Sequence, residues 1–190
     1  MQSITRCNWC LSSDLMTKYH DTEWGTPLHD DNKLFEFLVL EGAQAGLSWN
    51  TILTRREGYR KAFENYNVSK IAKYSDKDFE RLVTDAGIIR NKLKIKSAIN
   101  NACRFLEVQK EFGSFDRYIW AFTGYEPVNN KFKKDSDIPP SSPLSDQISK
   151  DLKNRRFSFV GTTIIYAHLQ ATGMVNDHLV TCFRYNELVK

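Results

Sequence analysis

Cysteine and histidine side chains occur near both ends of the chain, where they could bind a metal ion. The candidates are Cys7, Cys10 and His20 on one side and His178 and Cys182 on the other. Thiolate and imidazole groups are preferred ligands of tetrahedral zinc, and the i, i+4 spacing of His178 and Cys182 would put both on one face of a helix. Four protein ligands would make a structural site that clips the chain ends together. Spacing alone leaves open whether Cys7 or Cys10 is the ligand, or whether these are a core cysteine and surface histidines.

A second group of residues could recognise an aromatic ligand. Glu41 precedes Trp49 across a stretch of small residues, and residues 19–25 hold further polar and aromatic side chains. A carboxylate beside an indole ring suits a flipped, electron-poor purine, which stacks on the indole while its exocyclic amine donates to the carboxylate. Alternatively, Trp9, Trp24 and Trp49 are core residues and Glu41 is a helix-end charge.

The stretch 84–92 indicates a backbone-binding element. It joins two expected helices through a short turn, and the second helix begins with Lys92, Lys94 and Lys96. Amides at a helix start hold phosphate groups, and basic side chains nearby add attraction without reading bases. A helix junction with a solvated basic face is the alternative. The candidate DNA contacts here are Gly87, Ile89, Arg90 and Lys92.

Helical periodicity accounts for most of the chain, so we expect an all-α fold. Apolar residues recur at spacings of three or four, whereas alternation typical of strands is absent. Ser48 and either Ser75 or Asp76 are expected to cap helices, and Gly113 to end one. The polar, proline-rich stretch 124–143 is expected to be a long loop, without an assigned role. The expected helices lie within residues 31–40, 46–66, 68–87 as two short pieces that end at a break at Gly87, 91–113, 115–120, 145–157 and 160–173.

The composition is that of a folded globular protein. The chain has 190 residues, 41% of them hydrophobic and 26% charged, and a net charge of +4 that suits an anionic partner. No apolar run of about 18 residues could cross a membrane, and the first residues do not follow the pattern of a signal peptide. We therefore expect a cytoplasmic protein, in which clustered cysteines bind metal more often than they form disulfides.

Taken together, the motifs resemble those of the 3-methyladenine DNA glycosylase I family, a zinc-containing branch of the helix–hairpin–helix glycosylases. The resemblance covers nearly the whole chain and is carried, in the family's order, by the stretches RCNW, YHDTEWG, LEGAQAGLSW, DAGIIRNKLKI, FVGTTI and VNDH. It implies one glycosylase unit over 1–190, with a central hairpin-containing lobe at about 31–145 and a zinc lobe formed by about 1–30 and 146–190.

The resemblance also implies the site residues. One structural Zn2+ would be bound by Cys7, His20, His178 and Cys182, which leaves Cys10 as an extra. Glu41 would be the catalytic residue and would bind the base together with Tyr19, Trp49 and Trp9. A loop that enters the duplex would be formed by Gln44, Gly46 and Leu47. Met16 stands where the family usually has a second pocket tyrosine.

The activity implied is base excision repair without a lysine Schiff base. The family acts on double-stranded alkylated DNA, hydrolyses the N-glycosidic bond of 3-methyladenine, releases the free base and leaves an abasic site. Alkylation at N3 makes the base a cation and weakens its bond to the sugar, so a strong general base is not needed. No obligate protein partner is implied. A catalytically idle protein that binds damaged DNA is the main alternative, and a structural zinc protein without DNA is a further one.

Overall fold

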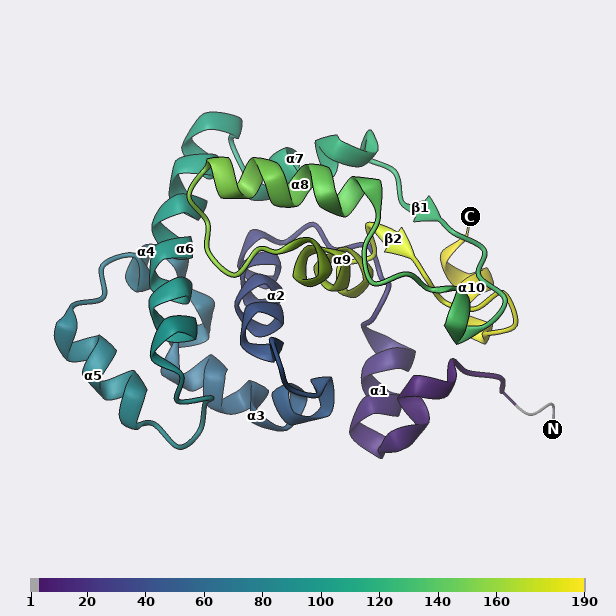
Figure 1. The fold of residues 1–190 in the computed structure, drawn as a ribbon, viewed down its shortest axis with the longest axis horizontal. Coiled ribbons are helices and arrows are strands. Elements are labelled where there is room, and N and C mark those ends of the chain that lie inside the picture. Colours follow the sequence, from purple (N-terminus) through teal and green to yellow (C-terminus); the bar gives the residue numbers. More distant parts are fainter. Residues whose placement is uncertain (1–3, 190) are drawn as a thin grey trace.

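The computed structural model describes residues 4–189, and this part of the chain is built almost entirely of helices (Figure 1). The prediction of an all-α fold is confirmed for these residues. The α-helices are α1 (Asp14–Thr22), α2 (Asp31–Gln44), α3 (Trp49–Ala62), α4 (Val68–Ile71), α5 (Asp76–Thr84), α6 (Lys92–Phe112), α7 (Phe115–Trp120), α8 (Pro143–Asn154), α9 (Thr162–Ala171) and α10 (Phe183–Leu188). Short 3-10 helices cover Asn8–Ser12, Glu64–Tyr66, Ala121–Thr123 and Asp135–Asp137.

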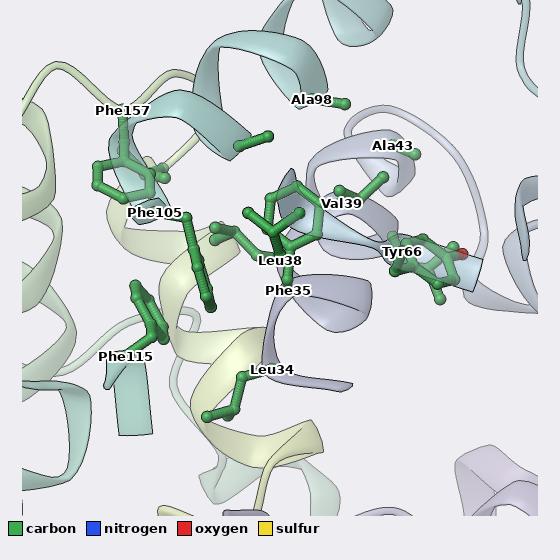
Figure 2. Packing of buried hydrophobic residues seen from close by; sticks show 14 of the residues in the cluster. Leu34, Phe35, Leu38, Val39, Ala43, Tyr66, Ala98, Phe105, Phe115 and Phe157 are labelled. Carbon is green, nitrogen blue, oxygen red and sulfur yellow. The ribbon is translucent and has the colours of Figure 1, made fainter. Parts of the chain in front are cut away.

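Helix α2 lies at the centre of the fold, where it contacts α3, α6, α7 and α9 (Figure 1). The Asp30 side chain caps it by accepting a hydrogen bond from the Lys33 amide. Its apolar residues are buried on several sides at once, and Figure 2 shows Phe35 beside Phe105, with their ring centroids 5.2 Å apart. The rings of Phe105 and Phe115 stack with their centroids 4.1 Å apart. This packing holds rigidly the helix that carries Glu41.

The expected helix ends are confirmed where a capping residue marks them. The Ser48 hydroxyl accepts from the Thr51 amide at 3.2 Å, so α3 begins at the next residue. Ser75 forms a capping box with Asp78 at the start of α5, and Gly113 follows the last residue of α6. Each cap satisfies backbone groups that the helix itself leaves unpaired.

The segment 124–143 departs slightly from a plain loop. It contains strand β1 (Val128–Asn129), which pairs in parallel with β2 (Val175–Asn176). The prediction that the chain forms no strands was therefore wrong for this one strand pair. A strand of 2 residues is too short to produce an alternating pattern in the sequence. The bridge attaches the segment to the chain that leads into the C-terminal helix (Figure 1).

Among the residues that the structure describes, none belongs to a helix long and apolar enough to span a bilayer.

Candidate functional site

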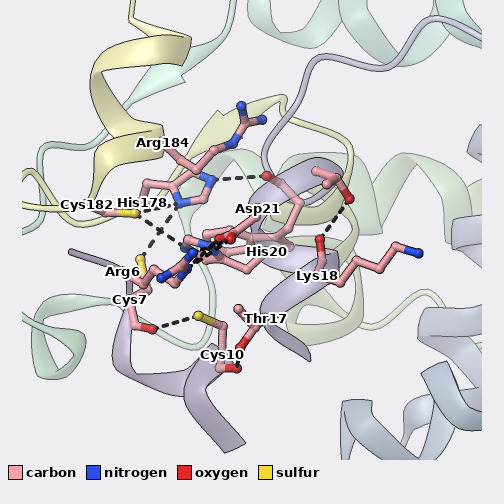
Figure 3. A network of polar contacts seen from close by, with 12 residues as sticks. Arg6, Cys7, Cys10, Thr17, Lys18, His20, Asp21, His178, Cys182 and Arg184 are labelled. Carbon is pink, nitrogen blue, oxygen red and sulfur yellow. Dashed lines mark hydrogen bonds and ion pairs between the residues drawn. The ribbon is translucent and has the colours of Figure 1, made fainter. Parts of the chain in front are cut away.

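The four cysteine and histidine residues predicted to bind a metal come together in a buried cluster. The ligand atoms of Cys7, His20, His178 and Cys182 all lie within 4.8 Å of one another. The Cys182 Sγ is 3.4 Å from His20 Nε2 and 3.6 Å from His178 Nδ1, and Cys7 Sγ is 3.8 Å from the same His178 nitrogen (Figure 3). Residues from the two ends of the described chain therefore form one site that could hold a metal ion.

The dimensions of the cluster fit a tetrahedral ion. With metal–sulfur bonds of about 2.3 Å and metal–nitrogen bonds of about 2.0 Å, tetrahedral ligands lie about 3.6 Å apart, close to the separations found. The pKa of the Cys182 thiol is lowered, chiefly because the Cys7 thiol donates to its sulfur and His178 and His20 add hydrogen bonds. The donors are the soft and borderline ligands that zinc prefers.

Cys10, which spacing alone left as a competing ligand, lies outside the cluster. Its thiol donates to the Cys7 carbonyl oxygen at 3.1 Å. The expectation that His178 and Cys182 share a helix face was wrong. They flank a turn, and α10 begins only at Phe183 with Cys182 as its N-cap residue. The turn brings the two ligand atoms together without helical geometry.

Hydrogen bonds outside the cluster orient both imidazoles. His20 Nδ1 lies 2.8 Å from an Asp21 carboxylate oxygen, which leaves Nε2 to face the sulfur atoms. Arg6 in turn donates to Asp21 at 2.8 Å. His178 Nε2 lies 3.1 Å from the Trp24 carbonyl oxygen, so its Nδ1 faces the cluster (Figure 3). Such partners are characteristic of histidine ligands in metal sites, because they set the tautomer and ring orientation.

A cavity of about 370 Å³ opens next to this cluster and collects the residues expected to bind a base. Helix α1 supplies Tyr19, α2 supplies Glu41 and α3 begins with Trp49. Because His20 follows Tyr19 on α1, one helix contributes to both the metal cluster and the cavity. The full lining is Trp9, Met16, Tyr19, Trp24, Glu41, Gln44, Trp49, Asp135, Ile138, Ala167 and Gln170.

Three polar atoms of the cavity residues are buried without a hydrogen-bond partner in the described part of the chain: Glu41 Oε2, Tyr19 Oη and Trp49 Nε1. Burial raises the pKa of Glu41 to about 8. Buried polar groups are nearly always paired in folded proteins, so three unpaired ones around one cavity indicate a polar ligand. The arrangement offers one carboxyl and two further hydrogen-bonding groups.

Aromatic rings enclose the same cavity. The rings of Tyr19 and Trp49 are 5.6 Å apart between centroids, and those of Trp9 and Trp24 are 4.9 Å apart. Trp9 also lies edge-on to the metal-cluster residue His20 at 5.4 Å. A flat aromatic ligand would find apolar faces here, beside the polar groups described above.

Sequence reasoning missed several residues of this cavity. Trp24 belonged to the polar and aromatic stretch 19–25 but was not assigned to the base, and Asp135, Ile138, Ala167 and Gln170 were not considered individually. Gln170 donates to the buried Asp177 at 2.8 Å, and its place in the cavity depends on the packing of α9 against α2. Only Trp24, inside the polar and aromatic stretch 19–25, carried a local signal.

The loop between α2 and α3 is exposed to solvent, and hydrogen bonds from a lysine side chain fix the end of α2 from which it starts. Gly46 has a φ of +76°, a conformation that favours glycine, and the Leu47 side chain is 40% exposed. The Lys94 ammonium donates to the carbonyl oxygens of Ala43 and Ala45 at 2.8 and 2.6 Å. Lys94 thus binds the end of α2 instead of extending into solvent, contrary to the expectation of a free basic group.

The expected helix–turn–helix junction is formed by α5, the turn 85–91 and α6. It packs on α3 so closely that a Cβ atom at Gly58 would lie 2.2 Å from the Gly87 carbonyl oxygen. The Ile89 amide donates to the Tyr59 hydroxyl at 3.3 Å, and Arg90 and Lys92 are exposed. The turn therefore presents two basic side chains on a supported backbone.

Two of the backbone amides at the start of α6 already donate hydrogen bonds within the protein. The Asn91 side chain accepts hydrogen bonds from the amides of Leu93 and Lys94. The Lys96 ammonium lies 5.4 Å from the centroid of the Phe79 ring. Of the three lysines expected to face a phosphate backbone, Lys92 and Lys96 are exposed, whereas Lys94 is partly buried against the end of α2.

Comparison with known proteins places this geometry in context. The family model described as methyladenine glycosylase matches residues 9–185. DNA-3-methyladenine glycosylase 1 of Escherichia coli K12 is 47% identical over 182 residues, which cover 96% of this chain and 97% of that protein. A crystal structure of 3-methyladenine DNA glycosylase I superposes with a TM-score of 0.91 at 45% identity, covering 94% of this chain and 98% of that one. A Staphylococcus aureus structure, described as the structural basis of 3-methyladenine recognition by this enzyme, gives a TM-score of 0.91 at 33% identity, covering 95% of this chain and 96% of that one.

Proposed function

Because the chain belongs to the methyladenine glycosylase family, we propose that it hydrolyses the N-glycosidic bond of 3-methyladenine in alkylated DNA. The reaction releases the free base and leaves an abasic site, as the first step of base excision repair. The observation that carries the proposal is the aromatic cavity with three unpaired buried polar atoms, on Glu41, Tyr19 and Trp49. A flipped purine has a flat surface that can stack on the aromatic rings of the cavity. Its polar edge can form hydrogen bonds with the three unpaired atoms.

In this proposal the base stacks on Trp49 with Trp9 at the edge of the cavity, while Tyr19 and Glu41 contact its polar edge. The pKa of about 8 for Glu41 means that its carboxyl group is mostly neutral at pH 7 in the empty cavity. A cationic base would favour the ionised carboxylate, because an opposite charge nearby offsets the cost of burial. Glu41 therefore responds to the charge that distinguishes the alkylated base from adenine.

The chemistry requires little beyond this recognition. The proposal involves no lysine Schiff base. Alkylation at N3 already weakens the glycosidic bond, so extrusion of the base, its binding in a stacked pocket and entry of water suffice. Cleavage then transfers the bonding electron pair to the base, which leaves as a neutral molecule. Water adds to the positively charged sugar and loses a proton to solvent.

The exposed loop and the helical junction supply the DNA contacts of this proposal. Gln44, Gly46 and Leu47 enter the double helix where the base leaves, and the Lys94 ammonium supports the base of this loop. The junction binds the phosphate backbone of double-stranded DNA through Gly87, Ile89, Arg90 and Lys92. Arg90→Glu should weaken duplex binding and reduce its dependence on salt, because fewer counterions are released.

The metal of the buried cluster is proposed to be one structural Zn2+, held by Cys7, His20, His178 and Cys182. Four protein ligands leave no position for water, so the ion stabilises the fold and takes no part in hydrolysis. Its fit is supported by the burial and separations of the ligand atoms.

The proposed function is tested by release of free 3-methyladenine from a methylated duplex. Wild-type protein should release the base, and Trp49→Ala should release it more slowly by roughly 5- to 150-fold, because stacking on an aromatic ring contributes about 1–3 kcal/mol. Trp49→Phe keeps a ring and should recover part of the rate, which separates stacking from misfolding. A folded, zinc-loaded wild type that binds duplex DNA but releases no base would instead indicate a protein that only binds damage.

A further inference from the structure

The segment 124–143 reaches the proposed base pocket, although its sequence suggested no role. Asp135, in a 3-10 turn of this segment, lines the same cavity as Glu41, and so does Ile138. The Asn8 side chain donates to Asp135 Oδ2 at 2.9 Å, and the Val180 amide donates to the Phe132 carbonyl at 2.9 Å. The turn is thus attached to chain segments on both sides of the metal cluster.

Among residues 4–189, Glu41 and Asp135 are the two acidic residues that line the cavity, and no lysine or arginine of this range lines it. They differ in depth: the Glu41 side chain is buried, whereas Asp135 is exposed at the opening. Asn8 occupies one oxygen of Asp135, and within residues 4–189 no hydrogen bond to the other oxygen is found. The Asp135 carboxylate therefore presents one oxygen to solvent beside the cavity.

We propose that Asp135 is a specificity-determining residue, which favours entry of a cationic alkylated base into the cavity. The proposal rests on the function proposed above, since it concerns the charge of that substrate. Asp135 attracts the positive base at the opening before Glu41 contacts it inside. A neutral, unmodified purine gains nothing from this charge.

The same charge acts in the opposite direction on the rest of the DNA. Phosphate groups that pass the opening of the cavity are repelled by Asp135, whatever the sequence or damage. For a duplex with a neutral base, this repulsion weakens binding and nothing offsets it. For a duplex with a cationic base, the attraction between the base and Asp135 offsets the repulsion. Asp135 therefore raises selectivity without a requirement for tighter binding.

The test compares Asp135→Asn with Asp137→Asn. Asp137 belongs to the same turn and is also exposed, but it lies 3.7 Å from the Lys134 ammonium and does not line the cavity. Both variants change the net charge equally. Each is assayed for single-turnover release of 3-methyladenine from duplex DNA, and for binding of the undamaged duplex, at low and moderate salt.

For Asp135→Asn we expect release to be about two- to fivefold slower at low salt, the size typical of a solvent-exposed charge pair. The difference should shrink as salt is added, because salt screens exposed charges. Binding of the undamaged duplex should be unchanged or tighter. Asp137→Asn should release the base at the wild-type rate.

Wild-type release by Asp135→Asn, or equal slowing by both variants, would overturn the inference while leaving the proposed function intact. Weaker binding of undamaged duplex by Asp135→Asn would also overturn it, since the residue would then be a DNA contact. Absence of base release by the wild type would instead overturn the proposed function and this inference together.

Discussion

Replacing Glu41 with glutamine should stabilise the folded protein at neutral and alkaline pH while it slows base release. The pKa of Glu41 is raised from 4.5 to about 8 because its carboxyl group is withdrawn from water without a hydrogen-bond partner for Oε2. Below pH 4.5 the group is protonated in both the folded and the unfolded chain, and burial costs no charge. As the pH rises towards 8, the unfolded chain loses the proton and the folded chain keeps it, so the free energy of unfolding falls.

The size of this effect follows from the two pKa values. Each pKa unit corresponds to about 1.4 kcal/mol, so the wild type should lose about 4 kcal/mol relative to Glu41→Gln between pH 5 and pH 9. For a chain of this length, that corresponds to a Tm difference of about 10 °C at the alkaline end. Glutamine keeps the shape of the side chain and never ionises.

Urea unfolding of both proteins at several pH values from 5 to 9 measures the difference directly, because contributions from other titrating groups cancel. Glu36→Gln is a matched control on the same helix. The Glu36 carboxylate accepts from Arg56 at 2.6 Å, so its replacement should destabilise the fold. A Glu41→Gln difference that stays constant from pH 5 to pH 9 would show that this carboxyl group is not desolvated in the folded protein.

Two further predictions concern the fold. Cys182→Ser should lower the free energy of unfolding by on the order of 5 kcal/mol and remove its sensitivity to chelators, because one of four buried ligands is lost. Cys103, which is half-buried outside the cluster, provides the control Cys103→Ser, and a wild-type melting curve that chelators leave unchanged would contradict the prediction. Gly58→Ala should cost about 3 kcal/mol in urea unfolding, because its Cβ would lie 2.2 Å from the Gly87 carbonyl oxygen. Gly161→Ala, where a Cβ meets nothing within 4 Å, should change stability by less than about 1 kcal/mol, and an equal loss in both variants would refute the steric explanation.

Features encoded by nearby residues were predictable from the sequence. The apolar run from Leu34 to Leu40 indicated a buried helix, and Ser48 and Ser75 marked helix starts that the structure confirms. Glu41 and Trp49 were singled out because a carboxylate and an indole near each other suit an aromatic ligand. Their placement around one cavity agrees with that reasoning.

Features that depend on distant parts of the chain were not predictable in this way. Periodicity cannot reveal that Lys94 reaches back to two carbonyl groups at the end of α2, nor that Asp135 meets the cavity. The helix expected for His178 and Cys182 failed because their i, i+4 spacing is also compatible with a turn. The missed contacts and the wrong helix have the same cause: tertiary packing, and not local preference, determines the geometry at these positions.

The hydrogen bond between His178 and the Trp24 carbonyl has a consequence for the order of events during protein synthesis. It joins residues 154 positions apart, and Cys7 and His178 are 171 positions apart. At about 5–20 residues per second, a ribosome makes Trp24 roughly 10 to 30 s before His178. During that time α2 can already pack with its neighbours, while the aromatic side of the pocket lacks the imidazole that supports it. A nascent chain would thus pass much of its synthesis unable to hold a base, and one that stops before His178 should be inert.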